Sequence, residues 1–285
     1  MIIRDFLPGT AVSEFVQCYR IVHFEFDKAE NIPIKALPPK PEQSLHFFLR
    51  DPVAIENADI KKSYYPSIIL AGQRTSLIKI FNGSNLLNVQ IVFQPMAVFR
   101  LTGIPAYELT NRHLDATSIF QKDIRFTFEK LQSAKDYSEL IDIVDFFAQE
   151  LICNSRKDVL PLDFISRKMM QSGGNISIDW LAKESSLCTR QFRRKFFERT
   201  GVNPKTYVRI IHFNKAYNFK NWSPDNDWSR IAVECGYSDY QHLAKEYKEF
   251  TGLTPPELHL LEKASPENVL GLTKSLYHNR FRATY

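Results

Sequence analysis

Hydrophobic and polar positions follow two different patterns along the chain, and the change falls near residue 155. Before it, apolar residues gather in short runs rich in β-branched and aromatic side chains and bounded by Gly, Pro or Asn, which is typical of β-strands. Beyond it, apolar residues recur three and four positions apart, as on one face of an α-helix. The runs that predict strands are residues 45–49, 67–71, 76–81 and 89–93.

Two helical segments are expected to close the strand-rich half, at residues 119–133 and 136–152. A stripe like that of the second helix is more often internal core than a dimer interface, because a helix of this length normally buries one face in its own domain. Residues 154–158, before Pro161, are a candidate linker. The stripe consists of Leu140, Ile143, Val144, Phe147 and Leu151.

An internal repeat occupies the second half of the chain. Residues 181–188 align with residues 231–238 at an offset of 50, and the offset then becomes 51, which a one-residue insertion explains. The pairs aligned at the second offset are Phe192 with Leu243, Phe196 with Tyr247, Gly201 with Gly252 and Pro204 with Pro255.

Each copy of the repeat predicts a helix-turn-helix unit. Four residues after an Ala comes a turn position, filled by Ser186 in one copy and by Gly236 in the other. Gly suits a turn that needs positive φ, whereas Ser there costs roughly 1 kcal/mol. Thr189 and Asp239, or the residue before each, are expected to cap the second helix. That helix is expected to stop at a Gly that has a Pro three residues later.

A single helix is expected to join the two units. Pro204 suits its first turn, and the apolar spacing continues toward Lys220. These 17 residues would form a helix about 25 Å long, which can hold two recognition helices near the roughly 34 Å spacing of successive major grooves. The polar loop at residues 221–227 ends it.

Charge is unevenly distributed over the 285 residues. The formal net charge is +5, and residues 161–285 hold 19 Lys and Arg against 13 Asp and Glu, whereas residues 1–160 hold 18 against 19. Such an asymmetry points to nucleic acid or another anionic surface, although an excess of this size also arises by chance.

The sharpest charge pattern lies in the second helix of the first unit. Phe192 and Phe196 share one helix face, and another face carries three arginines. An arginine face suits insertion into the major groove, because Arg can bond guanine O6 and N7 bidentately. The alternative interpretation is an ordinary amphipathic surface helix. The residues of the second face are Arg190, Arg193, Arg194 and Phe197.

Composition disfavours several other classes. Hydrophobic residues make up 44% and charged residues 24% of the chain, which argues against bulk disorder, and no apolar run approaches membrane-spanning length. The chain start lacks the features of a signal peptide, so we expect a cytoplasmic protein. The four cysteines lie far apart and His23 and His46 have no His-x-His spacing, so we predict no disulfide framework, no metal site and no cofactor.

At the repeat, the chain resembles the AraC/XylS family of bacterial transcription regulators. The resemblance covers about residues 176–258, and its most specific piece is residues 231–239. Further matching positions are His242-Leu243, Tyr247-Lys248 and residues 251–255.

The resemblance implies an α+β protein with a strand-rich first domain that ends in a helical pair, followed by an all-α domain. The expected divisions are a sensor or dimerisation domain over residues 1–155, a tandem helix-turn-helix DNA-binding domain over residues 162–262, and a tail over residues 263–285. A docked tail is favoured over an additional basic arm, although the tail carries Lys274, Arg280 and Arg282.

The resemblance also assigns roles to side chains, with recognition helices over residues 189–199 and 239–250. His242 lies at the margin of the second set. His212, Leu243 and Ser186 depart from the residues usual in the family. The implied base-reading residues are Arg190, Arg193, Arg194, Tyr240, Gln241 and Lys245, and the implied phosphate-positioning residues are Thr189, Lys195 and Lys248.

These features predict a sequence-specific, ligand-responsive regulator of transcription that reads two successive major grooves. Its expected partners are double-stranded DNA, an unidentified small-molecule effector and RNA polymerase, with homodimerisation left open and no membrane. One alternative is a regulator whose first domain only contacts other proteins. Another is a DNA-repair alkyl-transfer enzyme, but Cys18 and Cys153 are expected in apolar surroundings and no Pro-Cys-His-Arg run is present, so we predict no enzyme.

Overall fold

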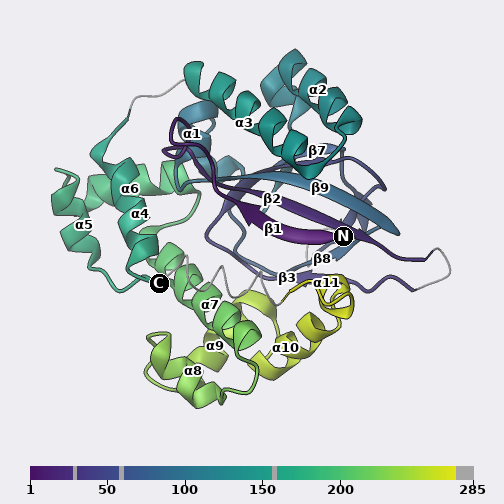
Figure 1. The fold of residues 1–285 in the computed structure, drawn as a ribbon. Helices are drawn as coiled ribbons and strands as arrows, with labels where there is room; N and C mark the ends of the chain where they lie inside the picture. Colours follow the sequence, from purple (N-terminus) through teal and green to yellow (C-terminus); the bar gives the residue numbers. More distant parts are fainter. Residues whose placement is uncertain (28–30, 58–60, 156–158, 274–285) are drawn as a thin grey trace.

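The computed structural model describes residues 1–27, 31–57, 61–155 and 159–273 (Figure 1). Its first half is strand-rich and its second half is helical, which confirms the α+β prediction. The candidate linker at residues 154–158 falls largely outside the described residues, as do Lys274, Arg280 and Arg282 of the tail.

The strands form two antiparallel sheets. The large sheet has the order β1-β2-β9-β4-β7-β10, and the small sheet has the order β3-β8-β5-β6. The strands are β1 (Ile2–Phe6), β2 (Val16–Glu25), β3 (Lys35–Leu37), β4 (Gln43–Phe48), β5 (Ala54–Glu56), β6 (Ser63–Tyr64), β7 (Ile68–Ala71), β8 (Ile78–Phe81), β9 (Asn85–Phe93) and β10 (His113–Asp115).

The remaining regular elements of the described chain are helices. Three short elements are α1 (Ala97–Thr102), the 3-10 helix η1 (Ala106–Glu108) and α11 (Pro266–Val269). The longer ones are α2 (Thr117–Ser133), α3 (Tyr137–Cys153), α4 (Pro161–Gln171), α5 (Ile178–Glu184), α6 (Thr189–Thr200), α7 (Pro204–Trp222), α8 (Trp228–Glu234), α9 (Tyr240–Thr251) and α10 (Pro255–Lys263).

The large sheet is the middle layer of the first half. One face packs against α2 and α3, which lie above it in Figure 1. The apolar stripe of α3 is internal core here, because Leu140, Val144 and Phe147 are buried against this face. The opposite face looks toward the small sheet. Side chains alternate across the sheet, so Tyr19 of β2 faces the helices while Arg20 faces the space between the sheets.

The second half contains the two predicted helix-turn-helix units, with α5 and α6 in the first and α8 and α9 in the second. Ala182 and Ala232 are buried where the helices of each unit cross. Both turns are closed by the same two backbone bonds, from Ser186 N to Lys183 O and Leu187 N to Ala182 O in the first, and from the equivalent residues in the second. The turn residue is left-handed in each, with φ 55° at Ser186 and 88° at Gly236, as expected.

Each recognition helix is capped at the predicted position or at the residue before it. In the second unit Asp239 caps α9 by accepting a hydrogen bond from His242 N. In the first unit the cap position is Cys188, one residue before Thr189, and no side chain bonds to the helix end. The joining helix α7 spans 19 residues, two more than predicted, and is about 28 Å long.

The two units have separate cores, and each includes one residue from the first half of the chain. Phe192 and Phe196 pack in the first core beside Met96. Phe213 and Tyr247 pack in the second core, against which Leu77 lies. Both cores of the helical half therefore contact the strand-rich half.

Candidate nucleic-acid interface and ligand cavity

The first recognition helix, α6, buries its aromatic side and exposes its arginine side. Phe192 and Phe196 are fully buried, whereas Arg190, Arg193 and Arg194 are exposed. Within the described part of the chain, none of the three arginines forms an ion pair with a carboxylate. Their guanidinium groups are therefore available to an external acceptor.

The second recognition helix, α9, exposes the side that corresponds to the arginine side of α6. Gln241 and Lys245 are exposed, as is His242, whose ring lies edge-on to the ring of Tyr237 at 5.3 Å. Tyr240 is half-buried and packs against the core of the second unit. Only part of the Tyr240 side chain is thus accessible.

The predicted phosphate-positioning residues flank these faces. Thr189 donates a hydrogen bond from its hydroxyl to Asp179 at 3.1 Å, which joins α6 to α5. Lys195 is half-buried and Lys248 is exposed. The structure therefore keeps all three at the surface, although Thr189 already has a partner.

Arg209 of α7 orients α9. Its guanidinium bonds to Glu246 at 2.5 Å and to Glu249 at 2.6 and 2.9 Å, and its centre lies 5.1 Å from the ring of Phe250. The bonds to the two carboxylates keep the pKa of Arg209 above its ordinary value despite partial burial. This basic residue supports the interface instead of contributing a free charge to it.

The strand-rich half holds the carboxy-terminal end of α6. Thr110 donates a hydrogen bond from its hydroxyl to Gly201 O at 2.8 Å, and the rings of Tyr107 and Phe197 are stacked at 5.4 Å. Gly201 has φ 84°, and a Cβ there would lie 2.6 Å from Ala106 O. Gly201 therefore both ends the helix and admits the backbone of η1.

The end of α9 is held by a single backbone bond from Leu77 N to Phe250 O, of 3.1 Å. Further contacts come from α10 and α11, which dock on β3. The ammonium of Lys35 lies 2.6 Å from carboxylate oxygens of both Glu262 and Glu267, and Tyr217 donates to Glu262 at 2.5 Å. Because Lys35 and Glu262 are buried, this cluster joins the two halves through charges that water does not screen.

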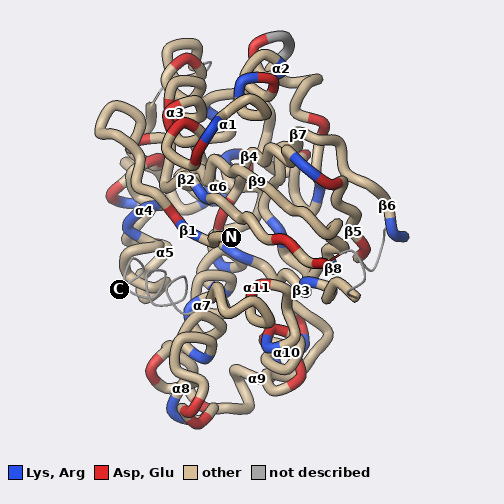
Figure 2. The backbone as a smooth tube through the Cα atoms, turned by 45° about the vertical axis from the view of Figure 1, so that its right-hand side comes forward, with Lys and Arg blue, Asp and Glu red and all other residues tan. Residues whose placement is uncertain are grey.

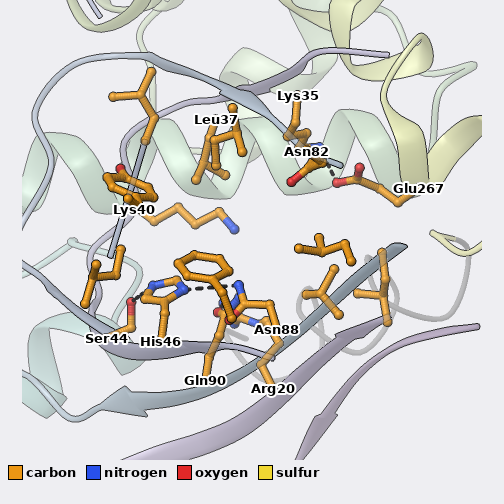
Figure 3. A pocket seen from close by; sticks show the side chains of 18 of the residues that line it. Arg20, Lys35, Leu37, Lys40, Ser44, His46, Asn82, Asn88, Gln90 and Glu267 are labelled. Carbon is orange, nitrogen blue, oxygen red and sulfur yellow. Dashed lines mark hydrogen bonds and ion pairs between the residues drawn. The ribbon is translucent and has the colours of Figure 1, made fainter. Parts of the chain in front are cut away.

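A cavity of about 120 Å³ lies between the two sheets. Large-sheet residues such as His46 and Asn88 line one side and small-sheet residues such as Leu37 line the other, while Tyr217 and Glu267 from the helical half close it. Figure 3 shows Lys40 extended between the two sides, with His46 bonded to Ser44 and Asn88. Both halves of the protein therefore supply walls of this cavity.

Several charged groups face the cavity. Arg20 pairs with Asp5 at 2.7 Å and with Glu42 at 3.2 Å, and Lys40 lies 3.8 Å from the same Glu42. Arg74 also lines the cavity. Sequence reasoning predicted no effector residue. Arg20 could have been noticed in the sequence, because it is a charged residue inside an apolar run. Arg74 could not, because it lies in a polar stretch that follows a strand.

Two histidines of the strand-rich half are held as neutral side chains. Burial, together with nearby positive charge from Arg74, lowers the pKa of His46 and of His113 to about 3. His23 bonds through Nδ1 to the hydroxyl of Tyr137 at 2.7 Å. Over the described ranges, no three His, Cys, Asp or Glu side chains gather as metal ligands would.

The cysteine surroundings differ in part from prediction. Cys18 is buried in β2 as expected. Cys153, expected in apolar surroundings, is exposed because it is the last residue of α3, where the helix leaves its core.

The charge of the surface is mixed. Figure 2 shows Lys and Arg interspersed with Asp and Glu along both halves of the molecule, so in that view the positive excess forms no single continuous patch. No helix in the described ranges combines the length and apolarity that crossing a membrane requires.

Comparison with known families finds two separate matches along the chain. Residues 181–259 match the model described as a helix-turn-helix domain, and residues 4–115 match a domain of unknown function, DUF6597. The carboxy-terminal part of the chain is therefore a helix-turn-helix domain of the AraC type, and this confirms the resemblance seen in the sequence.

Among curated proteins, the chain is similar to the HTH-type transcriptional activator RhaS. It is 27% identical to RhaS of Escherichia fergusonii over 90 residues, which are 32% of each chain, and 28% identical to RhaS of Yersinia pestis over 91 residues, which are 31% of this chain and 33% of that one. The match thus spans about a third of the length of these relatives.

Among solved structures, the fold is similar to ToxT of Vibrio cholerae, with a TM-score of 0.48 and 12% identity over 85% of this chain and 98% of that one. ToxT has also been solved with an unsaturated fatty acid bound, and that structure has a TM-score of 0.48 and 11% identity over 87% of this chain and 96% of that one.

Proposed function

We propose that the protein is a sequence-specific DNA-binding transcription regulator that reads two successive major grooves of double-stranded DNA. The observation that carries the proposal is the pair of helix-turn-helix units on one helix, α7, with polar and cationic side chains exposed at matching positions of α6 and α9. A recognition helix needs this exposure near its amino-terminal end, where it meets base edges.

The exposed side chains suit distinct tasks. Arg190, Arg193 and Arg194 of α6 can bond guanine bidentately, and Gln241 of α9 can bond adenine in the same way. Lys245 and the accessible edge of Tyr240 complete the base-reading set. Thr189, Lys195 and Lys248 contact phosphates, which fixes register without reading sequence.

The regulator responds to a small-molecule effector bound between the two sheets. The cavity there is closed by Tyr217 of α7 and Glu267 of α11, so its occupant can contact the helical half directly. A ligand shifts the equilibrium between two arrangements of the halves when it binds one arrangement better than the other. A cavity wall that both halves supply allows such a difference in binding. RNA polymerase is the expected protein partner, homodimerisation is a further prediction, and the protein acts by regulation and not by catalysis.

The decisive experiment selects bound duplexes from a random pool with the full chain and then footprints the selected DNA. We expect two protected motifs about 10 base pairs apart on one face of the duplex. Log affinity should fall linearly with log salt concentration, because Lys and Arg displace counterions from phosphates. A triple Arg190→Ala, Arg193→Ala, Arg194→Ala variant should lose selection at one motif only. Enrichment of no motif, or of a single unpaired motif, would refute the proposal.

A further inference from the structure

The charges around the cavity are paired with one clear exception. Arg20 and Lys40 both face Glu42, and Arg20 also has Asp5. Arg74 is only 8% exposed and lines the cavity, yet its Nε has no hydrogen-bond partner and its guanidinium forms no ion pair within the described residues. A buried charge without a partner is strongly unfavourable, so this arrangement calls for an anion.

A second donor beside Arg74 also lacks a partner. The hydroxyl of Tyr65 is buried, lines the same cavity and makes no hydrogen bond. Burial lowers the pKa of Arg74, and the charge of Glu42 and then the nearby Tyr65 partly counter that shift, although Glu42 forms its ion pairs with Arg20 and Lys40. Two neighbouring donors without an acceptor define the position of a missing acceptor.

The walls beyond these donors are apolar and aromatic. The ring of Phe48 stacks at 5.8 Å on the ring of His46 and at 6.0 Å on the ring of Tyr65, which makes a continuous aromatic wall. The space of about 120 Å³ is close to that of an engineered apolar cavity of about 150 Å³ that accepts benzene. The apolar side chains that complete the lining include Val22, Phe24, Leu37, Ile69, Ile78 and Ile80.

We propose that this cavity binds a small organic monocarboxylate. Its carboxylate accepts hydrogen bonds from the Arg74 guanidinium and the Tyr65 hydroxyl, and its apolar body, about one ring in size, lies along Phe48. Arg pairs with a carboxylate in a planar, bidentate geometry. One negative charge matches the one guanidinium without an ion pair, whereas a phosphate would bring a second charge into a cavity whose other cations already pair with Glu42, Glu262 or Glu267.

This inference names the ligand class of the effector site and rests on the proposed function only for its regulatory consequence. Tyr217 and Glu267 close the same cavity. Glu267 belongs to the Lys35–Glu262–Glu267 cluster that joins the two halves, and Tyr217 donates a hydrogen bond to Glu262 of that cluster. A carboxylate bound at Arg74 therefore occupies a cavity whose walls come from both halves of the protein.

The test measures binding to the full chain by calorimetry and thermal shift with benzoate and hexanoate as probes. Benzamide, hexanamide and inorganic phosphate serve as comparisons. We expect saturable binding of at least one carboxylate and a raised melting temperature, with the matching amide at least about tenfold weaker. Arg74→Met should abolish carboxylate binding while leaving the melting temperature of the unliganded protein equal or higher, because the uncompensated charge is gone.

Arg100→Met is the matched control. Arg100 is 4% exposed, but it is paired with Glu14 at 2.7 Å and lies 4.0 Å from the ring of Phe15, so its loss should lower the melting temperature and leave carboxylate binding in place. Four outcomes would each overturn the inference. Three concern binding: acids and amides bind equally, phosphate binds more strongly, or no carboxylate binds saturably at millimolar concentration. The fourth is a melting temperature that falls in Arg74→Met as it does in Arg100→Met.

DNA binding is measured separately on the selected duplex. Arg74→Met should bind it as the unliganded wild type does, without a response to carboxylate. Carboxylate binding without DNA binding would leave the cavity inference standing and refute the proposed function, and DNA binding without carboxylate binding would do the reverse.

Discussion

The contact between the two halves of the protein can be tested by substituting two glycines that have the same backbone role. Gly201 and Gly252 both end recognition helices with a left-handed backbone, at φ 84° and 74°. An added Cβ at Gly201 would meet Thr110 and would lie 2.6 Å from Ala106 O, whereas at Gly252 it would meet nothing within 4 Å. Gly201→Ala therefore perturbs the docking of η1 on α6, and Gly252→Ala is its control.

The expected magnitudes follow from these contacts. Each alanine costs about 1 kcal/mol for its left-handed backbone. Gly201→Ala also loses the hydrogen bond from Thr110, about 1 kcal/mol, and the stacking of Tyr107 on Phe197, about another 1 kcal/mol. We expect total losses of about 3 kcal/mol for Gly201→Ala and about 1 kcal/mol for Gly252→Ala, with about 2–4 °C of melting temperature for each kcal/mol.

Scanning calorimetry of both variants measures the difference, and hydrogen exchange locates it. Amides of residues 106–110 should exchange faster in Gly201→Ala and at the wild-type rate in Gly252→Ala. Equal losses of melting temperature in the two variants, with no local change in exchange, would refute the docking of the strand-rich half on α6.

Three further predictions concern the DNA interface, the cluster that joins the halves, and the cavity. Arg193→Ala should weaken binding to the preferred duplex by about 1–3 kcal/mol and relax base choice at one position, as measured by anisotropy; an equal loss on every duplex would instead make Arg193 a phosphate contact. Lys35→Met should cost about 3–5 kcal/mol in denaturant unfolding, because it leaves Glu262 buried with an uncompensated charge, whereas Arg230→Ala at an exposed pair should cost less than about 1 kcal/mol. The pKa of His46 and of His113 falls from 6.5 to about 3 on folding, so the unfolded chain binds more protons between these two pH values. The free energy of unfolding should therefore decrease as pH is lowered through that window, by up to about 1.4 kcal/mol per pH unit for each histidine. His46→Gln should flatten this dependence in urea titrations, and an unchanged slope would contradict the reasoning.

The helical half could be predicted closely because its signals are local. The boundaries of α6 and α9, the left-handed turn at Ser186 and the stop at Gly201 depend on residues within a few positions of one another. The strand-rich half was predicted in outline, through β4, β7, β8 and β9. The other six described strands were missed because most are short, and β2 carries charged and polar residues such as Arg20 among its apolar ones.

The sequence by itself determined the tandem helix-turn-helix units, since periodicity, turn residues and helix ends act over short stretches of chain. Only the tertiary structure decided which strands are neighbours, and so which side chains face the cavity. Arg74 and Tyr65 come together with Phe48 through pairing of β4 with β7, and Lys35 meets Glu262 across 227 positions of sequence. Burial and charge compensation depend on everything packed around a group, so no local pattern could have identified Arg74 as a buried cation without an ion pair.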